Sequence, residues 1–326
     1  MRRYTIIINI LLAVLSPIIF FGVLEIITRA VWHYKIEDTH TGLVLEGTNR
    51  QVQSEVITYK INSKGIRNRE IEGKEIVSAN KRILALGDSF VWGDGLNEDA
   101  LITTKIERML QLQYPGVVVI NAGISTYNTE DEYKQLLRLS PIYHPNHILV
   151  FFFTNDVLAT RTNAAGNRHD ESRIQNLKEF LRKRSKFFAF LYHQYKTKYA
   201  VKIGVPQYLL PPDYFNLDDS KPGWITFKQS VLKIRDYCLN DFTTLQFIII
   251  PTLTNLDENY PYKELHNKVK EFLNQSSIPF VDLFHTFAHY QPSELWVSPE
   301  NCHWNNKATS IATEEIVKNL MVNMEK

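Results

Sequence analysis

Short runs of apolar residues alternate along the chain with longer segments whose apolar residues recur at helical spacing. Runs of about four to eight apolar residues are typical of strands covered on both faces. Strands that alternate with helices of this length favour parallel pairing through right-handed crossovers. We therefore predict an α/β domain with three layers, α/β/α, around a five-stranded parallel sheet. The predicted strands are residues 82–88, 117–121, 147–153, 245–250 and 278–283, and the predicted helices lie near 98–113, from about 130, and near 225–241, 260–275 and 307–324.

Residues 4–24 form an apolar run without a charged side chain, preceded by Arg2 and Arg3. At about 1.5 Å per residue, a helix of this length spans a bilayer. A cleaved signal peptide is the alternative, although the apolar core is long and no convincing cleavage site follows it. We expect residues 1–35 to be an uncleaved signal anchor in the inner membrane. The basic residues at its start would then place the rest of the chain on the periplasmic side.

Residues 36–80 are mostly polar and contain one alternating piece, from Val56 to Asn62, followed by Ser63-Lys64-Gly65. Alternation that ends in such a turn is typical of a strand. We predict a linker with a small hairpin here, while a linker without regular structure is the alternative. The main domain is then expected to cover residues 81–326.

A long interruption separates the third predicted strand from the helix near 225. Residues 157–222 exceed the length of an ordinary loop, and insertions of this kind often serve as lids or binding walls. Between Glu171 and Lys202 there are nine basic and two acidic residues, beside a helical stripe of apolar side chains. The insertion is expected to be helical. It packs on the domain with a solvated basic edge, or it faces anionic lipid or an acidic glycan.

The overall composition adds few constraints. The 37 basic and 35 acidic residues nearly balance, which gives no case for a nucleic-acid partner. The two cysteines, Cys238 and Cys302, are too few for a disulfide framework, and no Cys/His spacing resembles a zinc site. A single bridge between them is possible, but their neighbours indicate separate positions.

Polar residues follow the ends of the predicted strands, where open α/β sheets bind ligands. Gly87-Asp88-Ser89 ends the first strand, the turn from Gly123 to Thr126 follows the second, and Asn155 ends the third. His303, with Glu300 three residues before it, immediately precedes the last helix. Alone, a Gly-Asp-Ser is also a plain turn, and a lone histidine is more often a cap or a core residue.

These four elements, in this order, resemble the SGNH or GDSL-type hydrolases, which have a flavodoxin-like sheet. The resemblance covers about Arg82 to the C-terminus, apart from the insertion. It implies that Ser89 is the nucleophile, that His303 is its base and that Glu300 orients the histidine. It also implies an oxyanion hole formed by the backbone N–H of Ser89, the backbone N–H of Thr126 and the side-chain amide of Asn155.

Three positions depart from the family pattern: Glu300 replaces an aspartate, Phe153 replaces the glycine of Gly-x-Asn-Asp, and Thr126 replaces a glycine. The N–H of Thr126 remains a usable donor only if threonine adopts the φ of that turn. Asp88 and Asp156 are interpreted as supporting residues that bind nearby loop backbone, with Gly123 in the turn between them. Trp92 and Trp304 either form a wall that stacks on sugar or belong to the aromatic core.

The chemistry of this set is acyl transfer, because an imidazole can take the proton of a serine hydroxyl while a carboxylate fixes the imidazole tautomer. No metal or organic cofactor is required. The leading hypothesis is a membrane-tethered serine esterase of the bacterial envelope that acts on an O-acyl group of a glycan. A lipid ester is a second possible substrate. Alternatives are an O-acyltransferase for surface polysaccharide and a non-catalytic envelope protein that binds a glycan or a partner.

Overall fold

The structure is a computed structural model that describes residues 2–31, 48–52, 55–158, 180–181, 184–191, 218–298 and 301–324. The chain divides into two compact units. One comprises residues 1–39 and 165–203, and the other comprises residues 40–164 and 204–326. The second unit contains the sheet and every strand-end residue singled out above.

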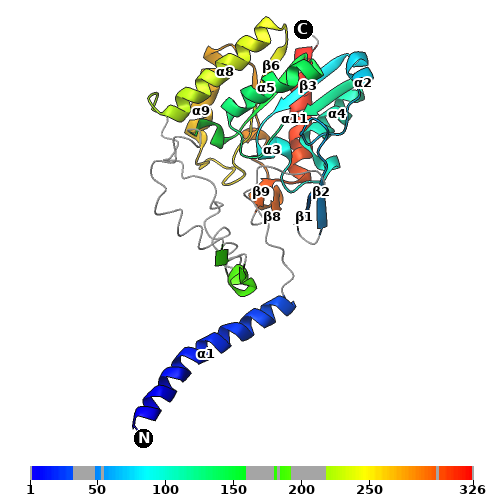
Figure 1. Ribbon diagram of the computed structural model, residues 1–326. Coiled ribbons are helices and arrows are strands. Elements are labelled where there is room, and N and C mark those ends of the chain that lie inside the picture. Colours follow the sequence, from blue (N-terminus) through cyan, green and yellow to red (C-terminus); the bar gives the residue numbers. More distant parts are fainter. Residues whose placement is uncertain are drawn as a thin grey trace. The chain divides into compact units, whose positions relative to one another are not determined.

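A five-stranded parallel sheet forms the centre of the second unit, in the order β4-β3-β5-β6-β7 (Figure 1). The strand that comes first in the sequence, β3, lies between β4 and β5, which is the flavodoxin-like order. The prediction of a five-stranded parallel sheet is therefore confirmed. Its strands are β3 (Lys81–Leu86), β4 (Val117–Asn121), β5 (His147–Phe152), β6 (Thr244–Ile249) and β7 (Phe280–Asp282).

Successive side chains of the sheet point to opposite faces, so each face has its own hydrophobic core. Ile83 and Ala85 of β3 belong to the core on one face, and Leu84 and Leu86 belong to the core on the other. All four side chains are completely buried. A strand with both faces covered must be apolar throughout, which explains the continuous apolar runs in the sequence.

Helices cover both faces of the sheet and complete the three layers (Figure 1). Side chains of α4 (Ile102–Gln111) and α11 (Asn306–Met324) fill the first core. Side chains of α5 (Thr129–Tyr143), α8 (Pro222–Asn240) and α9 (Lys263–Gln275) fill the second. The remaining short helices of this unit are α2 (Gly73–Ser78), α3 (Ser89–Trp92) and α10 (Phe284–Phe287), with 3-10 turns at Glu98–Ala100, Thr154–Val157 and Pro292–Glu294.

Two small antiparallel pairs lie outside the main sheet. Strands β1 (Thr48–Val52) and β2 (Glu55–Tyr59) pair with each other. The alternating piece of the linker, from Val56 to Asn62, thus overlaps β2, whose partner comes before it in the chain. Strands β8 (Trp296–Ser298) and β9 (Asn301–Trp304) form the second pair. The sequence did not predict β8 and β9, because strands of three and four residues carry too little periodicity to recognise.

The first unit contains α1 (Arg2–Val31), which includes Pro17. Near the end of α1 the Glu25 carboxylate accepts hydrogen bonds from the Ser185 hydroxyl at 2.8 Å and from the Phe187 N–H at 2.9 Å. Within the parts of the chain that the structure describes, no helix combines the length and the apolar character that crossing a bilayer requires. Most of the predicted insertion at 157–222, including most of its basic cluster, lies outside the described residues.

Candidate active site

Ser89 lies at the carboxyl end of β3, as the first residue of the one-turn helix α3. The Asp88 carboxylate caps this helix by accepting from the Phe90 N–H at 2.9 Å. Gly93, at φ 81°, closes the turn and donates its N–H to the Ser89 carbonyl at 3.0 Å. A φ in this region favours glycine, so the sequence Ser-Phe-Val-Trp-Gly fixes the length of the turn.

Two glycines let neighbouring backbone approach α3 closely. A Cβ on Gly123 would lie 2.4 Å from the backbone nitrogen of Trp92, and a Cβ on Gly87 would lie 2.3 Å from Val91 Cγ2. Both distances are far below ordinary contact, so any larger residue would displace the helix. Gly123 therefore supports the position of Ser89 by allowing the loop after β4 to pack directly against α3.

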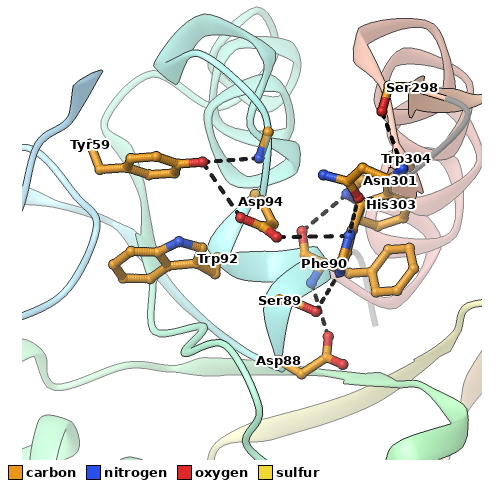
Figure 2. A network of polar contacts seen from close by, with 12 residues as sticks. Tyr59, Asp88, Ser89, Phe90, Trp92, Asp94, Ser298, Asn301, His303 and Trp304 are labelled. Atoms are coloured by element: carbon orange, nitrogen blue, oxygen red, sulfur yellow. Dashed lines mark hydrogen bonds and ion pairs between the residues drawn. The ribbon is translucent and has the colours of Figure 1, made fainter. Parts of the chain in front are cut away.

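His303 lies on β9 and brings its imidazole to the serine. Its Nε2 is 2.7 Å from Ser89 Oγ, although 214 positions separate the two residues in the chain (Figure 2). The Asn301 amide oxygen lies 2.5 Å from His303 Nδ1 and also accepts from the His303 backbone N–H at 3.2 Å. An amide oxygen only accepts, so Nδ1 carries the proton and Nε2 can accept from the serine hydroxyl. This is the tautomer that a general base requires.

A carboxylate also faces the imidazole: Asp94 Oδ2 lies 3.9 Å from His303 Nδ1. Sequence reasoning assigned this place to Glu300, which lies outside the described residues, and it missed both Asp94 and Asn301. The only local signal for Asp94 was its place between Gly93 and Gly95, five residues after Ser89, where two glycines allow a tight turn. Asn301 had no comparable signal, because its role depends on β9.

Asn155 and Thr126 lie on the loops after β5 and β4. The Asn155 amide donates to the Tyr127 carbonyl at 3.1 Å, which ties these two loops together. Its side chain also hydrogen-bonds to Asp88, the residue next to Ser89. Thr126 has a φ of 75°, the left-handed conformation that favours glycine, and its side chain is exposed. The threonine therefore keeps the kind of backbone conformation that a glycine would adopt, at a cost of about 1 kcal/mol or more.

Three buried acids, Asp88, Asp156 and Glu132, lie near Ser89. Asp88 binds the Phe90 N–H as described, and Asp156 accepts from the Phe153 N–H at 2.8 Å, as expected for supporting residues. Burial raises the pKa of Asp88 to about 7, against the lowering effect of its hydrogen bonds. Burial and neighbouring negative charge also raise the pKa values of Asp156 and of Glu132 on α5. These acids thus retain protons more readily than exposed carboxyls.

Of the two alternatives for Trp92 and Trp304, their burial favours the aromatic core over a wall that stacks on sugar. Trp304 is completely buried and donates its indole N–H to the Phe90 carbonyl at 3.0 Å. Trp92 is 5% exposed and stacks on Tyr59, with ring centroids 6.0 Å apart. Neither indole has a face available to a sugar ring. Both belong to the aromatic core, where they hold α3 against its neighbours.

The two cysteines are separate, as their sequence neighbours indicated. Cys238 on α8 and Cys302 on β9 are both free thiols in buried positions. Burial raises the pKa of Cys238 to about 12, so its thiol stays protonated and unreactive. Among the residues that the structure describes, no group of three or more His, Cys, Asp or Glu side chains is arranged to hold a metal ion.

Solved structures with a similar fold include several hydrolases. The esterase EstA from Pseudoalteromonas sp. matches at 14% identity with a TM-score of 0.45, over 76% of this chain and 100% of its own. A lipase/acylhydrolase from Enterococcus faecalis matches at 16% with a TM-score of 0.44, over 74% and 95%. An acetylxylan esterase from Geobacillus stearothermophilus, solved as a catalytic mutant, matches at 16% with a TM-score of 0.45, over 74% and 94%. Likenesses this distant carry no argument about substrate.

No curated protein matches the chain significantly. The family described as GDSL-like Lipase/Acylhydrolase, in contrast, matches residues 83–316. This match begins in β3, which leads into Ser89, and it ends in α11, beyond His303. It therefore includes all of the sheet except the first two residues of β3, and both residues of the serine–histidine contact. The chain belongs to the GDSL-like lipase/acylhydrolase family and is a serine hydrolase.

Proposed function

We propose that this protein is a membrane-tethered serine esterase that removes an O-acyl group from a glycan of the bacterial envelope. In this proposal Ser89 is the nucleophile and His303 is the general base and acid, with Glu300 as the acidic partner that the sequence predicts. The observation that carries the proposal is the 2.7 Å contact between Ser89 Oγ and His303 Nε2. A serine hydroxyl is a poor nucleophile near neutral pH until a base in such contact takes its proton.

The reaction proceeds in two steps on these atoms. Ser89 Oγ attacks the ester carbonyl while His303 Nε2 takes the hydroxyl proton, which leaves a tetrahedral oxyanion and an imidazolium. The imidazolium gives that proton to the leaving alkoxide, so that an alcohol departs and an acyl-serine remains. Water then attacks the acyl-serine with the same base, and the carboxylic acid and the free serine are released. Asn301 keeps the Nδ1 proton in place throughout, since its amide oxygen accepts at 2.5 Å.

The oxyanion needs donors that are already in position. We assign this role to the backbone N–H groups of Ser89 and Thr126 and to the Asn155 amide. Each donor in a site of this type contributes about 3 to 4 kcal/mol to transition-state stabilisation. The left-handed φ of Thr126 supports the assignment, since a strained backbone kept at a strand end is often functional.

The substrate and the tether are inferred from the sequence. An uncharged run at residues 4–24 favours a membrane-attached protein, and the extracytoplasmic face is where acylated envelope glycans are exposed. An acyltransferase uses the same acyl-serine and replaces water with a sugar hydroxyl. A lipid ester fits the same chemistry. The choice of acceptor and the length of the acyl group distinguish these cases.

The test uses the full chain, purified in detergent, with p-nitrophenyl acetate, butyrate and octanoate as substrates. We expect hydrolysis with a preference for acetate, and we expect Ser89→Ala to lower kcat by at least about a thousandfold. A fluorophosphonate should label the unaltered chain and leave Ser89→Ala unlabelled. Ser125→Ala, on the loop after β4, is the matched control and should retain both turnover and labelling.

Equal turnover by Ser89→Ala would contradict the proposal, as would a folded chain that neither reacts with fluorophosphonate nor hydrolyses any ester. Labelling together with acyl transfer to a sugar acceptor, without net hydrolysis, would replace the esterase with a transferase. A preference for octanoate would replace the glycan with a lipid. Separation of membrane and soluble fractions tests the tether, because the proposal requires the chain in the membrane fraction.

A further inference from the structure

Asp94 and His303 face each other on the side of the imidazole opposite the nucleophile (Figure 2). The loop that follows α3 carries Asp94 and turns back at Gly93 and Gly95, which both have a φ of 81°. At Gly95 a Cβ would lie 2.7 Å from Val297 Cγ1 on β8. Glycine at position 95 therefore lets the loop lie directly against the β8–β9 pair that carries His303, while glycine at position 93 lets it approach Leu101 and Arg67.

The Asp94 carboxylate is held from the other side by Tyr59, the last residue of β2 (Figure 2). The tyrosine hydroxyl donates to Asp94 Oδ1 at 3.5 Å and accepts from the Gly95 N–H at 3.1 Å. The Tyr59 ring is 3% exposed and stacks on Trp92. A buried ring in this position fixes the hydroxyl, and the hydroxyl in turn orients the carboxylate.

A buried arginine fixes the same loop. Arg67 is completely buried, and its guanidinium lies 4.4 Å from the centre of the Tyr59 ring. It donates to the carbonyl of Trp92 at 3.0 Å and to that of Gly93 at 2.6 Å. Burial lowers the pKa of Arg67 to about 10, while Tyr59, Glu98 and Asp94 act to raise it. The segment before the main sheet thus supplies both the ring and the cation that hold the Asp94 loop.

We propose that Asp94 is a positioning residue for His303: its carboxylate, fixed by Tyr59, stabilises the imidazolium that forms when Ser89 loses its proton. The inference rests on the proposed function and adds a second acidic partner to it, supplied by the loop after the nucleophile. Neutral Asn301 fixes the tautomer through its 2.5 Å contact but cannot balance a positive charge. The carboxylate of Asp94, at 3.9 Å, can balance that charge without a direct hydrogen bond.

This arrangement also assigns a function to the segment before the family match. Tyr59 and Arg67 precede residue 83, where the match begins. They lie outside the sequence pattern that the family shares, yet they contact the loop that faces the base. An enzyme shortened to the matched residues would retain Ser89, Asp94 and His303 but lose the groups that hold Asp94 in place.

The experiment compares Asp94→Asn, Asp94→Glu, Tyr59→Phe and Glu300→Gln in the full chain. We expect Asp94→Asn to lower kcat about 10- to 100-fold with KM little changed, less than the roughly 10⁴-fold loss for a directly bonded triad carboxylate. The acidic limb of its pH profile should move to lower pH, because removal of a nearby negative charge disfavours the imidazolium. Asp94→Glu should recover part of the loss. Tyr59→Phe should lower kcat about two- to tenfold, the effect of one hydrogen bond.

Asp99→Asn is the matched control, since it removes an exposed carboxylate five positions further along the chain, in the 3-10 turn Glu98–Ala100, and should change neither kcat nor the pH profile. An NMR titration of the His303 ring in each variant measures the charge coupling without turnover. A lower titration midpoint in Asp94→Asn supports the inference even if the chain hydrolyses no ester, so failure of the proposed function is recognised separately.

The inference is overturned if Asp94→Asn keeps both the kcat and the titration midpoint of the unaltered chain. It is also overturned if kcat falls only in proportion to the folded fraction and Asp94→Glu recovers nothing, since that result describes a structural residue. If Asp94→Asn does not fold, the Tyr59→Phe variant provides the test. The inference is rejected if this variant keeps the pH profile and the His303 titration midpoint of the unaltered chain. Loss of activity in Glu300→Gln alone, with Asp94→Asn unaffected, would leave Glu300 as the only acidic partner.

Discussion

Two histidines of this domain each face a carboxylate, and only one of them contacts a nucleophile. His303 lies between Ser89 and the Asn301–Asp94 side of the site, with Nε2 on the serine hydroxyl. His266 on α9 places Nδ1 at 3.1 Å from Asp282 Oδ1, and its Nε2 lies 3.1 Å from the Tyr260 hydroxyl. The same residue types thus occur twice, in a candidate catalytic arrangement and in a core arrangement.

The two histidines differ in how deeply they are buried and in which hydroxyl group their Nε2 atom contacts. His266 is 2% exposed, and its Nε2 accepts from a tyrosine whose pKa burial raises far above the usual range. That hydroxyl keeps its proton and has no access to a substrate. Ser89 and His303 are both only partly buried, and the hydroxyl that His303 contacts lies at the carboxyl end of the sheet. A histidine–carboxylate pair therefore indicates catalysis only when its free nitrogen meets an accessible nucleophile.

The largest expected effect separates the two histidines by activity. We expect His303→Gln to lower kcat by at least about a thousandfold, because the serine loses its base. His266→Gln should leave kcat per folded molecule within about twofold. Steady-state measurements with p-nitrophenyl acetate, corrected for the folded fraction, make the comparison. Similar losses in both variants would show that the two pairs are not functionally different.

We expect substitution of His266 to lower the stability of the fold far more than substitution of His303, the reverse of their effects on activity. His266→Leu removes the imidazole that contacts the buried Asp282 carboxylate and leaves Lys270, at 3.1 Å, as its charged partner. We therefore expect a cost of about 3 kcal/mol, the lower end for a broken buried pair. His303→Gln should change the free energy of unfolding by less than about 1 kcal/mol, since its site is partly exposed. Urea unfolding of both variants, followed by circular dichroism, provides the measurement. A stable His266→Leu would contradict a structural role for that pair.

The pH dependence of stability sharpens the comparison further. Burial alone would raise the pKa of Asp282. The pKa is nevertheless lowered from 3.8 to about 2, because the carboxylate accepts hydrogen bonds from His266, the Phe284 N–H and Lys270. A folded-state pKa below the unfolded value stabilises the fold above about pH 4, and that contribution is lost as the pH falls toward 2. The shift corresponds to about 2 kcal/mol.

Asp282→Asn should therefore show a shallower loss of stability between about pH 4 and pH 2 than the unaltered chain. Asp94→Asn is the control from the other pair. Thermal unfolding at a series of pH values gives both slopes. Equal slopes in Asp282→Asn and the unaltered chain would contradict the assigned role of the carboxylate in stability.

Much of the fold follows from local sequence. Five apolar runs placed the five strands of the sheet within about two residues, because a strand buried on both faces needs an unbroken apolar run. The carboxyl ends of the parallel strands drew attention to Ser89, since such strands bring their ends to one edge of the sheet. The resemblance to the GDSL-type hydrolases added His303, which the structure places on β9, outside the main sheet. The helix expected near 98–113 begins as a 3-10 turn at Glu98–Ala100, and the α-helix itself starts at Ile102. The residue at which a helix begins depends on how its first turn packs against the rest of the domain, and local sequence patterns do not report that packing.

The tertiary structure decided the surroundings of the nucleophile and the base. Trp92 and Trp304 flank Ser89 and His303 in the sequence, yet packing turns both indoles into the core. Asp94 was passed over, although it lies five residues from Ser89, because its direction depends on two left-handed glycines and on Tyr59 from β2.

By itself the sequence determined the sheet, because apolar periodicity reports strands buried on both faces. Its resemblance to the GDSL-type hydrolases pointed to Ser89 and His303 as the candidate nucleophile and base. Only the tertiary structure decided which groups face the second nitrogen of His303. That nitrogen meets Asn301 from its own strand and Asp94 from a loop more than 200 positions away. The physical reason is that hydrogen bonds and charge act over a few ångströms in space, whereas sequence patterns report only neighbours along the chain.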